Sequence, residues 1–184
     1  MFALYISLGL LALAVLWSIA TYNGLVKARN KVDEAWSGID VQLKRRHDLV
    51  PNLVETVNGY AAHERETLAE VARARAKAQA ARDPAEVEPA EERLANAIAS
   101  VQALAEAYPQ LEAAESFRRL QAELAEIEDE IQAARRIYNA NVQDYNTRLR
   151  IFPNVVIAGT MSFRPRDFIE IERATDRSFV AVAV

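Results

Sequence analysis

The feature that most constrains this chain is the run FALYISLGLLALAVLWSIA near its N-terminus, residues 2–20, which contains no charged side chain. At about 1.5 Å per residue, a helix of this length spans roughly 28 Å, close to the hydrocarbon thickness of a bilayer. Tyr5 lies near one end, and Trp17 and Tyr22 lie near the other, where interfacial aromatic residues are expected. The sequence therefore predicts a transmembrane anchor over residues 1–21 that contacts the lipid bilayer through residues 2–20.

A cleaved signal peptide is the alternative, with Ser18, Ile19 and Ala20 as the cleavage site. The absence of Lys or Arg before the apolar run, and the length of the run, favour an uncleaved anchor. Lys27, Arg29 and a third cation at 31 follow the span, so the positive-inside rule places the rest of the chain in the cytoplasm. We expect a single-pass protein of the bacterial inner membrane.

The composition of the remaining chain favours helices. Ala, Glu, Arg, Leu and Gln dominate, and there are only five glycines in 184 residues. The absence of cysteine excludes disulfides, thiolate nucleophiles and Cys-type zinc sites. The formal charge of −4 argues against nucleic acid as a partner, because such binding needs a clustered basic face.

Apolar residues follow a helical period in two long stretches. One seam runs through the second half of the chain at Phe117, Leu120, Leu124, Ile127, Ile131, Ala134, Tyr138, Val142, Tyr145, Leu149 and Phe152. The other runs through Val32, Trp36, Ile39, Leu43, Val50, Leu53, Val57, Tyr60 and Val71, and it includes two charged residues, Arg46 and Glu64. These two lie eighteen residues apart and share a face if the helix is unbroken, which favours partly buried structural roles.

Prolines and capping residues divide these stretches. Asp83 and Pro84 predict a helix start, and Tyr108 with Pro109 interrupts the next helix. We expect an all-α fold: the anchor, then an antiparallel up-down four-helix bundle over 22–153, with helices near 22–46, 49–82, 85–107 and 112–152. A long two-helix hairpin with proline kinks is the alternative. An apolar tail, 154–184, follows the bundle, and the sequence leaves its position against the bundle or the bilayer open.

The segment RRHDLVPNLV, residues 45–54, is where the first turn of the bundle is expected. Asp48 is placed to cap a new helix, and Pro51 then falls in the first turn, where its missing N–H costs little. Leu43 and Val50 are one heptad apart, however, so the seam can also continue through a proline kink.

A metal-dependent hydrolase using His47, Asp48, His63 and Glu64 is an alternative function, but the spacing of these residues is unfavourable. The two histidines lie sixteen residues apart, and no second histidine follows His63 at the spacing of a zinc protease. Gly-rich phosphate loops, nucleophile elbows and the Glu-x-x-His pattern of di-iron bundles are missing from the sequence. We expect no catalytic residue, metal or cofactor.

The dipeptide Tyr-Asn occurs at 22–23, 138–139 and 145–146. The last two copies are one heptad apart, which puts Tyr138 and Tyr145 on the seam, with Asn139 and Asn146 beside them. They are either a repeated contact for a partner or polar-tipped core aromatics with adjacent amides that fix helix register.

Several of these motifs together resemble the LemA family of bacterial membrane-anchored proteins. Three motifs carry the resemblance across most of the chain after the anchor: RR-x-DLVPNLV, EAYP-x-L and YN-x-x-V-x-x-YN. The first includes Asn52, and the second includes Tyr108 and Pro109. The tail has Met161-Ser162-Phe163 where the family pattern leads us to expect Phe-Gly-Phe. The resemblance implies an N-terminal anchor and a bundle of long antiparallel helices, and it supplies no reaction. One branch of the family is associated with magnetosome membranes.

The sequence thus predicts a non-enzymatic, membrane-anchored helical scaffold or adaptor that forms homo-oligomers or binds a membrane-protein partner. A regulatory subunit of a membrane protease or envelope-stress system is a further alternative, which rests on family analogy alone.

Overall fold

The computed structural model describes residues 1–61, 63–82 and 84–169. Within these residues all regular structure is helical, which confirms the all-α prediction. The six helices are α1 (Phe2–Asn58), α2 (Arg65–Ala80), α3 (Pro84–Ala105), α4 (Pro109–Glu112), α5 (Glu115–Arg150) and α6 (Asn154–Thr160). The expected cap at Asp83 lies outside the described residues.

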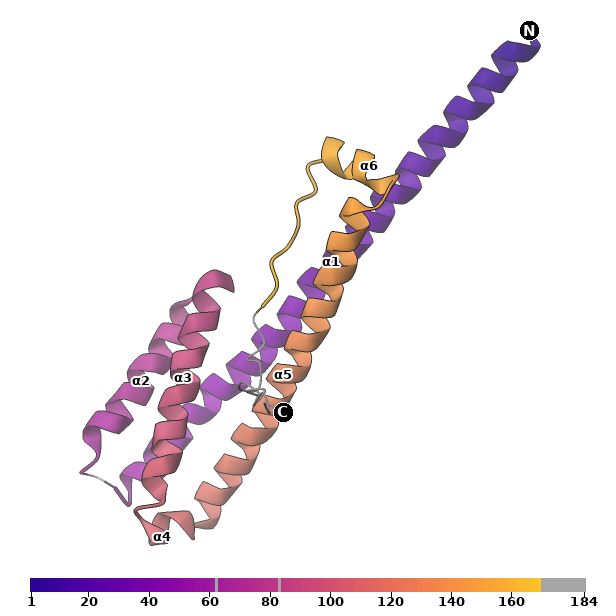
Figure 1. The fold of residues 1–184 in the computed structure, drawn as a ribbon. Helices are drawn as coiled ribbons and strands as arrows, with labels where there is room; N and C mark the ends of the chain where they lie inside the picture. The colour runs from indigo at the N-terminus through magenta and orange to yellow at the C-terminus, as the bar shows by residue number, and fades with distance from the viewer. Residues whose placement is uncertain (62, 83, 170–184) are drawn as a thin grey trace, which may run out of the picture.

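Helix α1 contains both the apolar N-terminal run and the first helix of the bundle. The apolar window near its N-terminus is long enough to cross a membrane, and none of that window is buried. Figure 1 shows this end of α1 projecting beyond the other helices. These properties are consistent with a single-pass membrane protein.

The turn expected between residues 46 and 49 is wrong. Helix α1 continues through Pro51 to Asn58, so Asp48 lies inside the helix and caps nothing. Burial explains why the helix continues and does not turn near Asp48. Leu43, Val50 and Leu53 form one continuous buried seam on both sides of the proline. The chain reverses later, between the end of α1 and the start of α2 at Arg65.

The proline inside α1 removes one helical hydrogen bond, which a neighbouring helix replaces. A residue at position 51 would normally donate its N–H to the carbonyl oxygen of residue 47, and proline has no N–H to give. In the structure the Nε of Arg75, on α2, donates a hydrogen bond of 2.7 Å to the carbonyl oxygen of His47. The helix therefore passes the proline without leaving this carbonyl unpaired.

The helices combine a four-helix end with a longer two-helix end (Figure 1). Helices α2 and α3 form an antiparallel hairpin beside the C-terminal part of α1 and the start of α5. Helix α5 then extends past this hairpin and packs antiparallel to α1 toward the N-terminal end. The break at Tyr108 and Pro109 is present, because Tyr108 precedes α4 and Pro109 occupies its first turn.

Two apolar clusters match this division. The first fills the four-helix end and includes Leu53, Val57, Val71, Leu94, Val101, Leu111 and Phe117. The second follows the α1–α5 pair to α6 and includes Leu25, Val32, Ile39, Ile131, Val142, Tyr145 and Ala158. Both clusters draw on the two seams visible in the sequence.

After α6 the chain turns back and runs along α5 as an extended segment over residues 161–169, which we call the tail segment (Figure 1). The turn is a Schellman motif, in which the N–H of Phe163 donates to the carbonyl oxygen of Ala158 at 3.2 Å. Ser162 occupies the left-handed position of this motif, with φ of 56°. The resemblance leads us to expect glycine here, the residue that adopts this conformation without steric cost.

Candidate functional site

The tail segment is held by the two asparagines that lie one heptad apart on α5. Asn139 donates to the carbonyl oxygen of Ile169 at 2.8 Å and accepts from the N–H of the same residue at 3.0 Å. Asn146 repeats this arrangement on Arg166, with distances of 2.8 and 2.9 Å. Each amide therefore binds both main-chain polar groups of one tail residue, as a neighbouring β-strand would.

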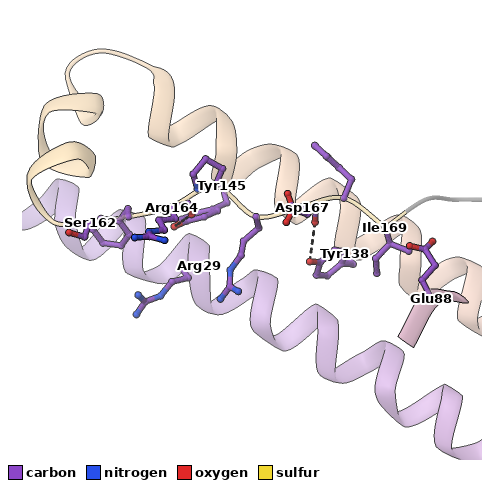
Figure 2. A pocket seen from close by; sticks show the side chains of 12 residues that line it. Arg29, Glu88, Tyr138, Tyr145, Ser162, Arg164, Asp167 and Ile169 are labelled. Carbon is purple, nitrogen blue, oxygen red and sulfur yellow. Dashed lines mark hydrogen bonds between the residues drawn. The ribbon is translucent and has the colours of Figure 1, made fainter. Parts of the chain in front are cut away.

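The two tyrosines of the same dipeptides bind the same segment. The hydroxyl of Tyr138 donates to the carbonyl oxygen of Asp167 at 3.2 Å, the bond drawn in Figure 2. The hydroxyl of Tyr145 donates to the carbonyl oxygen of Arg164 at 3.0 Å. Burial raises the pKa of both phenols above the ordinary value near 10, because it disfavours the phenolate.

The periods of the helix and the extended segment match. Seven helical residues rise about 10.5 Å, and three extended residues span about 10 Å. One heptad along α5 therefore corresponds to three residues along the tail segment. Asn146 binds Arg166, and Asn139, seven residues earlier, binds Ile169. We call these four side chains the Tyr–Asn ladder; its hydrogen bonds to the tail segment all end on main-chain atoms.

Side chains of the tail segment add contacts to α1. Arg166 forms an ion pair of 2.8 Å with Asp33. The ring of Phe163 meets Tyr22 edge to face at a centroid distance of 5.7 Å, and the guanidinium of Arg29 lies 5.8 Å from the same ring. The tail segment and the two long helices line a cavity of about 760 Å³. Figure 2 shows the side chains that surround it.

A second polar centre lies inside the four-helix end, around a buried carboxylate. Glu91, on α3, is 1% exposed, and its Oε1 lies 2.6 Å from Nε2 of His47. Its Oε2 accepts from Arg46 at 3.3 Å, and Arg46 also pairs with Glu128 on α5. Gln132 donates to the other oxygen of Glu128. The cluster links α1, α3 and α5 by charge-assisted hydrogen bonds.

His47 and Glu91 also line a cavity of about 360 Å³ together with Asp40, Lys44 and Arg82. A histidine oriented by a carboxylate is one part of a catalytic dyad. In the described part of the chain, however, the lining of this cavity contains no Ser, Thr or Cys that could serve as a nucleophile.

The structure does not bring together the four residues of the hydrolase alternative. His47 is buried against Glu91, whereas Asp48 and His63 are exposed. Glu64 lies after the end of α1 and accepts a long hydrogen bond of 3.5 Å from the hydroxyl of Tyr108. From position 47 to the end of α1 is already about 16 Å along the helix. Within the described residues no group of three or more His, Cys, Asp or Glu side chains is placed to hold a metal.

The remaining residues of the RR-x-DLVPNLV motif divide between the two faces of α1. Arg46 is buried, whereas Pro51 and Asn52 are exposed. Arg45, the neighbouring cation, reaches Glu130 on α5 at 2.5 Å.

Glu91 is the polar residue that the sequence reasoning missed, because it stands in an acidic stretch with Glu86, Glu88 and Glu92. A signal was nevertheless present. Val87, Glu91, Leu94, Ile98 and Val101 alternate steps of four and three, so Glu91 occupies an apolar seam position. A carboxylate on such a seam requires a buried cationic partner.

Known proteins resemble this chain over most of its length. Protein LemA of Metamycoplasma hominis is 29% identical over 134 residues, which cover 71% of this chain and 60% of that relative. The magnetosome proteins MamQ 1 and MamQ 2 of Paramagnetospirillum magneticum are each 23% identical over 198 residues, covering 91% of this chain and 73% of the relative. This chain thus spans less than two thirds of the length of its LemA relative. The model of the LemA family matches residues 35–183, and the chain accordingly belongs to the LemA family.

Proposed function

We propose that this protein is a membrane-anchored, non-catalytic scaffold whose copies assemble by exchanging their tail segments. The observation that carries the proposal is the Tyr–Asn ladder, which binds an extended chain only through its main-chain atoms. Such contacts accept the same segment from another copy as well as from the same chain. Exchange of an identical element between protomers is a low-cost route to an oligomer.

Geometry and confinement support exchange. The tail segment lies on the surface of the α1–α5 pair and is joined to α5 through the short helix α6. Anchoring in one bilayer raises the effective concentration of each copy for its neighbours, which helps an intermolecular contact to compete with the intramolecular one. The partner in this proposal is therefore a second copy of the chain, with its tail segment in the first copy's ladder.

The absence of native cysteine makes a direct test simple. One tagged copy carries Gln143→Cys, an exposed position between Asn139 and Asn146 on the ladder face of α5. A second, differently tagged copy carries Asp167→Cys in the tail. Both are produced in the same membrane and treated with a short bismaleimide. Exchange predicts a covalent heterodimer that carries both tags.

The control separates ladder binding from random collision. Adding Asn139→Ala and Asn146→Ala to the first copy should abolish the heterodimer, whereas Asn96→Ala, an exposed amide on α3, should leave it unchanged. A third variant carries both cysteines in one chain and reports docking of the tail segment within that chain. Cross-linking in this variant, with no heterodimer between the two singly substituted copies, would overturn the self-assembly proposal. Cross-linking of the ladder cysteine to a different protein in place of the second copy would also overturn self-assembly, and it would favour an adaptor.

The proposal places the bundle on the cytoplasmic side. The supporting observation is the row of cations at Lys27, Arg29 and Lys31, just after the apolar run. A fluorescent protein that matures only in the cytoplasm, fused after Val184, should fluoresce, whereas alkaline phosphatase at the same site should be inactive. The opposite pattern would reverse the orientation.

A further inference from the structure

The turn after α5 exposes a group of large apolar side chains. Ile151, Phe152, Val155, Val156 and Met161 are all exposed, and Phe152 is 82% exposed. They belong to a stretch of only eleven residues that includes α6. A contiguous apolar surface of this kind marks a contact site on a protein.

The register of the two long helices places this surface at the end of the apolar run of α1. The side-chain amide of Asn141 donates to the carbonyl oxygen of Lys31 at 3.3 Å, which fixes the level of α5 against α1. Antiparallel helices rise by the same amount per residue, so Arg150, the last residue of α5 and nine residues beyond Asn141, lies level with Tyr22. Phe152 follows two residues after the end of α5. Tyr22 lies two residues beyond the apolar run, which ends at Ala20.

Contacts of α6 and of the residues after it also place them beside the end of the apolar run of α1. Ile157 and Ala158 of α6 pack in the cluster that contains Leu25 of α1. Phe163, just after α6, meets the ring of Tyr22. The short helix therefore lies beside the part of α1 that leaves the apolar run, as Figure 1 shows.

The charges around this end have one sign. Residues 1–32 and 145–166 contain no Asp or Glu, and their cations are Lys27, Arg29, Lys31, Arg148, Arg150, Arg164 and Arg166. Two of them pair with acidic residues further from the apolar run, Arg148 with Asp144 and Arg166 with Asp33. Basic residues next to a membrane span favour the anionic headgroups of a lipid surface.

We propose that residues 151–161 form a second membrane contact, in which Phe152, Val155 and Val156 enter the bilayer interface beside the transmembrane run. The occupant of this surface is lipid: acyl chains cover the apolar side chains, and anionic headgroups lie against the surrounding cations. The contact continues the lipid-facing surface of α1 around the end of the bundle. It does not depend on tail exchange between copies.

The test uses the full chain in vesicles of phosphatidylcholine and phosphatidylglycerol. Single cysteines replace Val155 and, in a second variant, Phe152, and each carries an environment-sensitive nitrobenzoxadiazole probe. The matched control is Val41→Cys. Val41 is a valine of α1 that is 56% exposed and lies further along the helix, away from the apolar run. We expect blue-shifted emission at 155 and 152, strong quenching by lipids that carry a shallow nitroxide, and severalfold weaker quenching by aqueous iodide than at 41. Interfacial helices insert about 5–10 Å, within reach of such nitroxides.

Two results would overturn the proposal. Equal iodide quenching at 155, 152 and 41 would mean that the surface faces water. Protection from iodide without quenching by the lipid nitroxides would mean that protein, such as a second copy, covers it. Replacing phosphatidylglycerol with phosphatidylcholine should reduce nitroxide quenching at 155, and an unchanged value would overturn the role of the cations.

Discussion

Arg75 of α2 donates a hydrogen bond to the main-chain carbonyl oxygen of His47 in α1, at the position where Pro51 leaves that carbonyl without its helical donor. A side chain from one helix thus completes the backbone of another. The same bond ties α2, the first helix of the α2–α3 hairpin, to α1. The carbonyl oxygen that Pro51 leaves without a donor is thus paired by the long, charged side chain of a residue on a neighbouring helix.

This relationship predicts strong coupling between the two positions. Arg75→Met should lower the free energy of unfolding by about 1.5–3 kcal/mol, the usual value of a hydrogen bond to a charged group. In the Pro51→Ala background the same substitution should cost much less, because alanine supplies the missing N–H. Urea denaturation of the four variants, followed by circular dichroism in mild detergent, measures the coupling energy.

Arg73→Met is the matched control for that cycle. Arg73 lies two residues away on the same helix, is exposed, and pairs only with Glu70 of its own helix in the described structure. Surface pairs of this type contribute about 0–1 kcal/mol. Equal costs of Arg75→Met with and without Pro51 would contradict the compensation.

Glu91 provides a second prediction, about the buried ion cluster. Glu91→Gln should destabilise the fold by roughly 3 kcal/mol, near the lower end for breaking a buried pair, because Arg46 retains Glu128. Glu92→Gln, the exposed neighbour, should change stability by less than about 0.5 kcal/mol. The same denaturation measurement compares the two, and a neutral Glu91→Gln would show that the cluster adds no stability.

Much of this architecture could be predicted from the sequence, and the exceptions have physical causes. The seams through Val50 and Ile131 predict helices because burial follows the helical period. The turn at Asp48 was wrongly expected because local cap and proline preferences were outweighed by burial and by Arg75, twenty-four residues beyond Pro51. Local preferences cannot reveal a donor that arrives from another helix.

The ladder shows a different limit. The heptad spacing of Tyr138 and Tyr145 marked both dipeptides as special, but their partner in the structure is the main chain of residues 164–169. Main-chain carbonyl groups are common to all residues, and N–H groups to all except proline, so the tail leaves no matching side-chain pattern. The sequence therefore indicated one side of the contact and left the position of the tail open.

Ser162 gives a third prediction. Its φ of 56° is costly for a residue with a side chain, by about 1–2 kcal/mol, and glycine removes that cost. Ser162→Gly should therefore slow trypsin cleavage after Arg166, because a relaxed Schellman turn keeps the tail segment docked. Ser100→Gly, inside α3, should instead destabilise the fold by about 0.5–1 kcal/mol. Faster cleavage in Ser162→Gly would contradict the strain assigned to this turn.

The tyrosines of the ladder give a fourth prediction, on pH. Burial raises the pKa of Tyr138 and Tyr145 in the folded chain, so the unfolded chain ionises first. The stability that the two phenols contribute is complete below pH 10 and falls as the pH rises through their folded pKa values. Hydrogen exchange of residues 164–169 should accelerate beyond the intrinsic base-catalysed rate in that range. The double variant with Tyr138→Phe and Tyr145→Phe should lack this additional step, and an identical step in the variant would assign it to other groups.

The unbroken course of α1 has a consequence for the proposed assembly of copies in a membrane. Anchor and bundle share one helix of about 85 Å, from Phe2 to Asn58, so the direction of the anchor is also the direction of the bundle. In the proposed assembly, copies in one bilayer would stand parallel, with Asn139 and Asn146 of each at the same height as the tail segment of the next. A membrane would thereby limit the search of one copy for another to motion in a plane and rotation about the axis of α1.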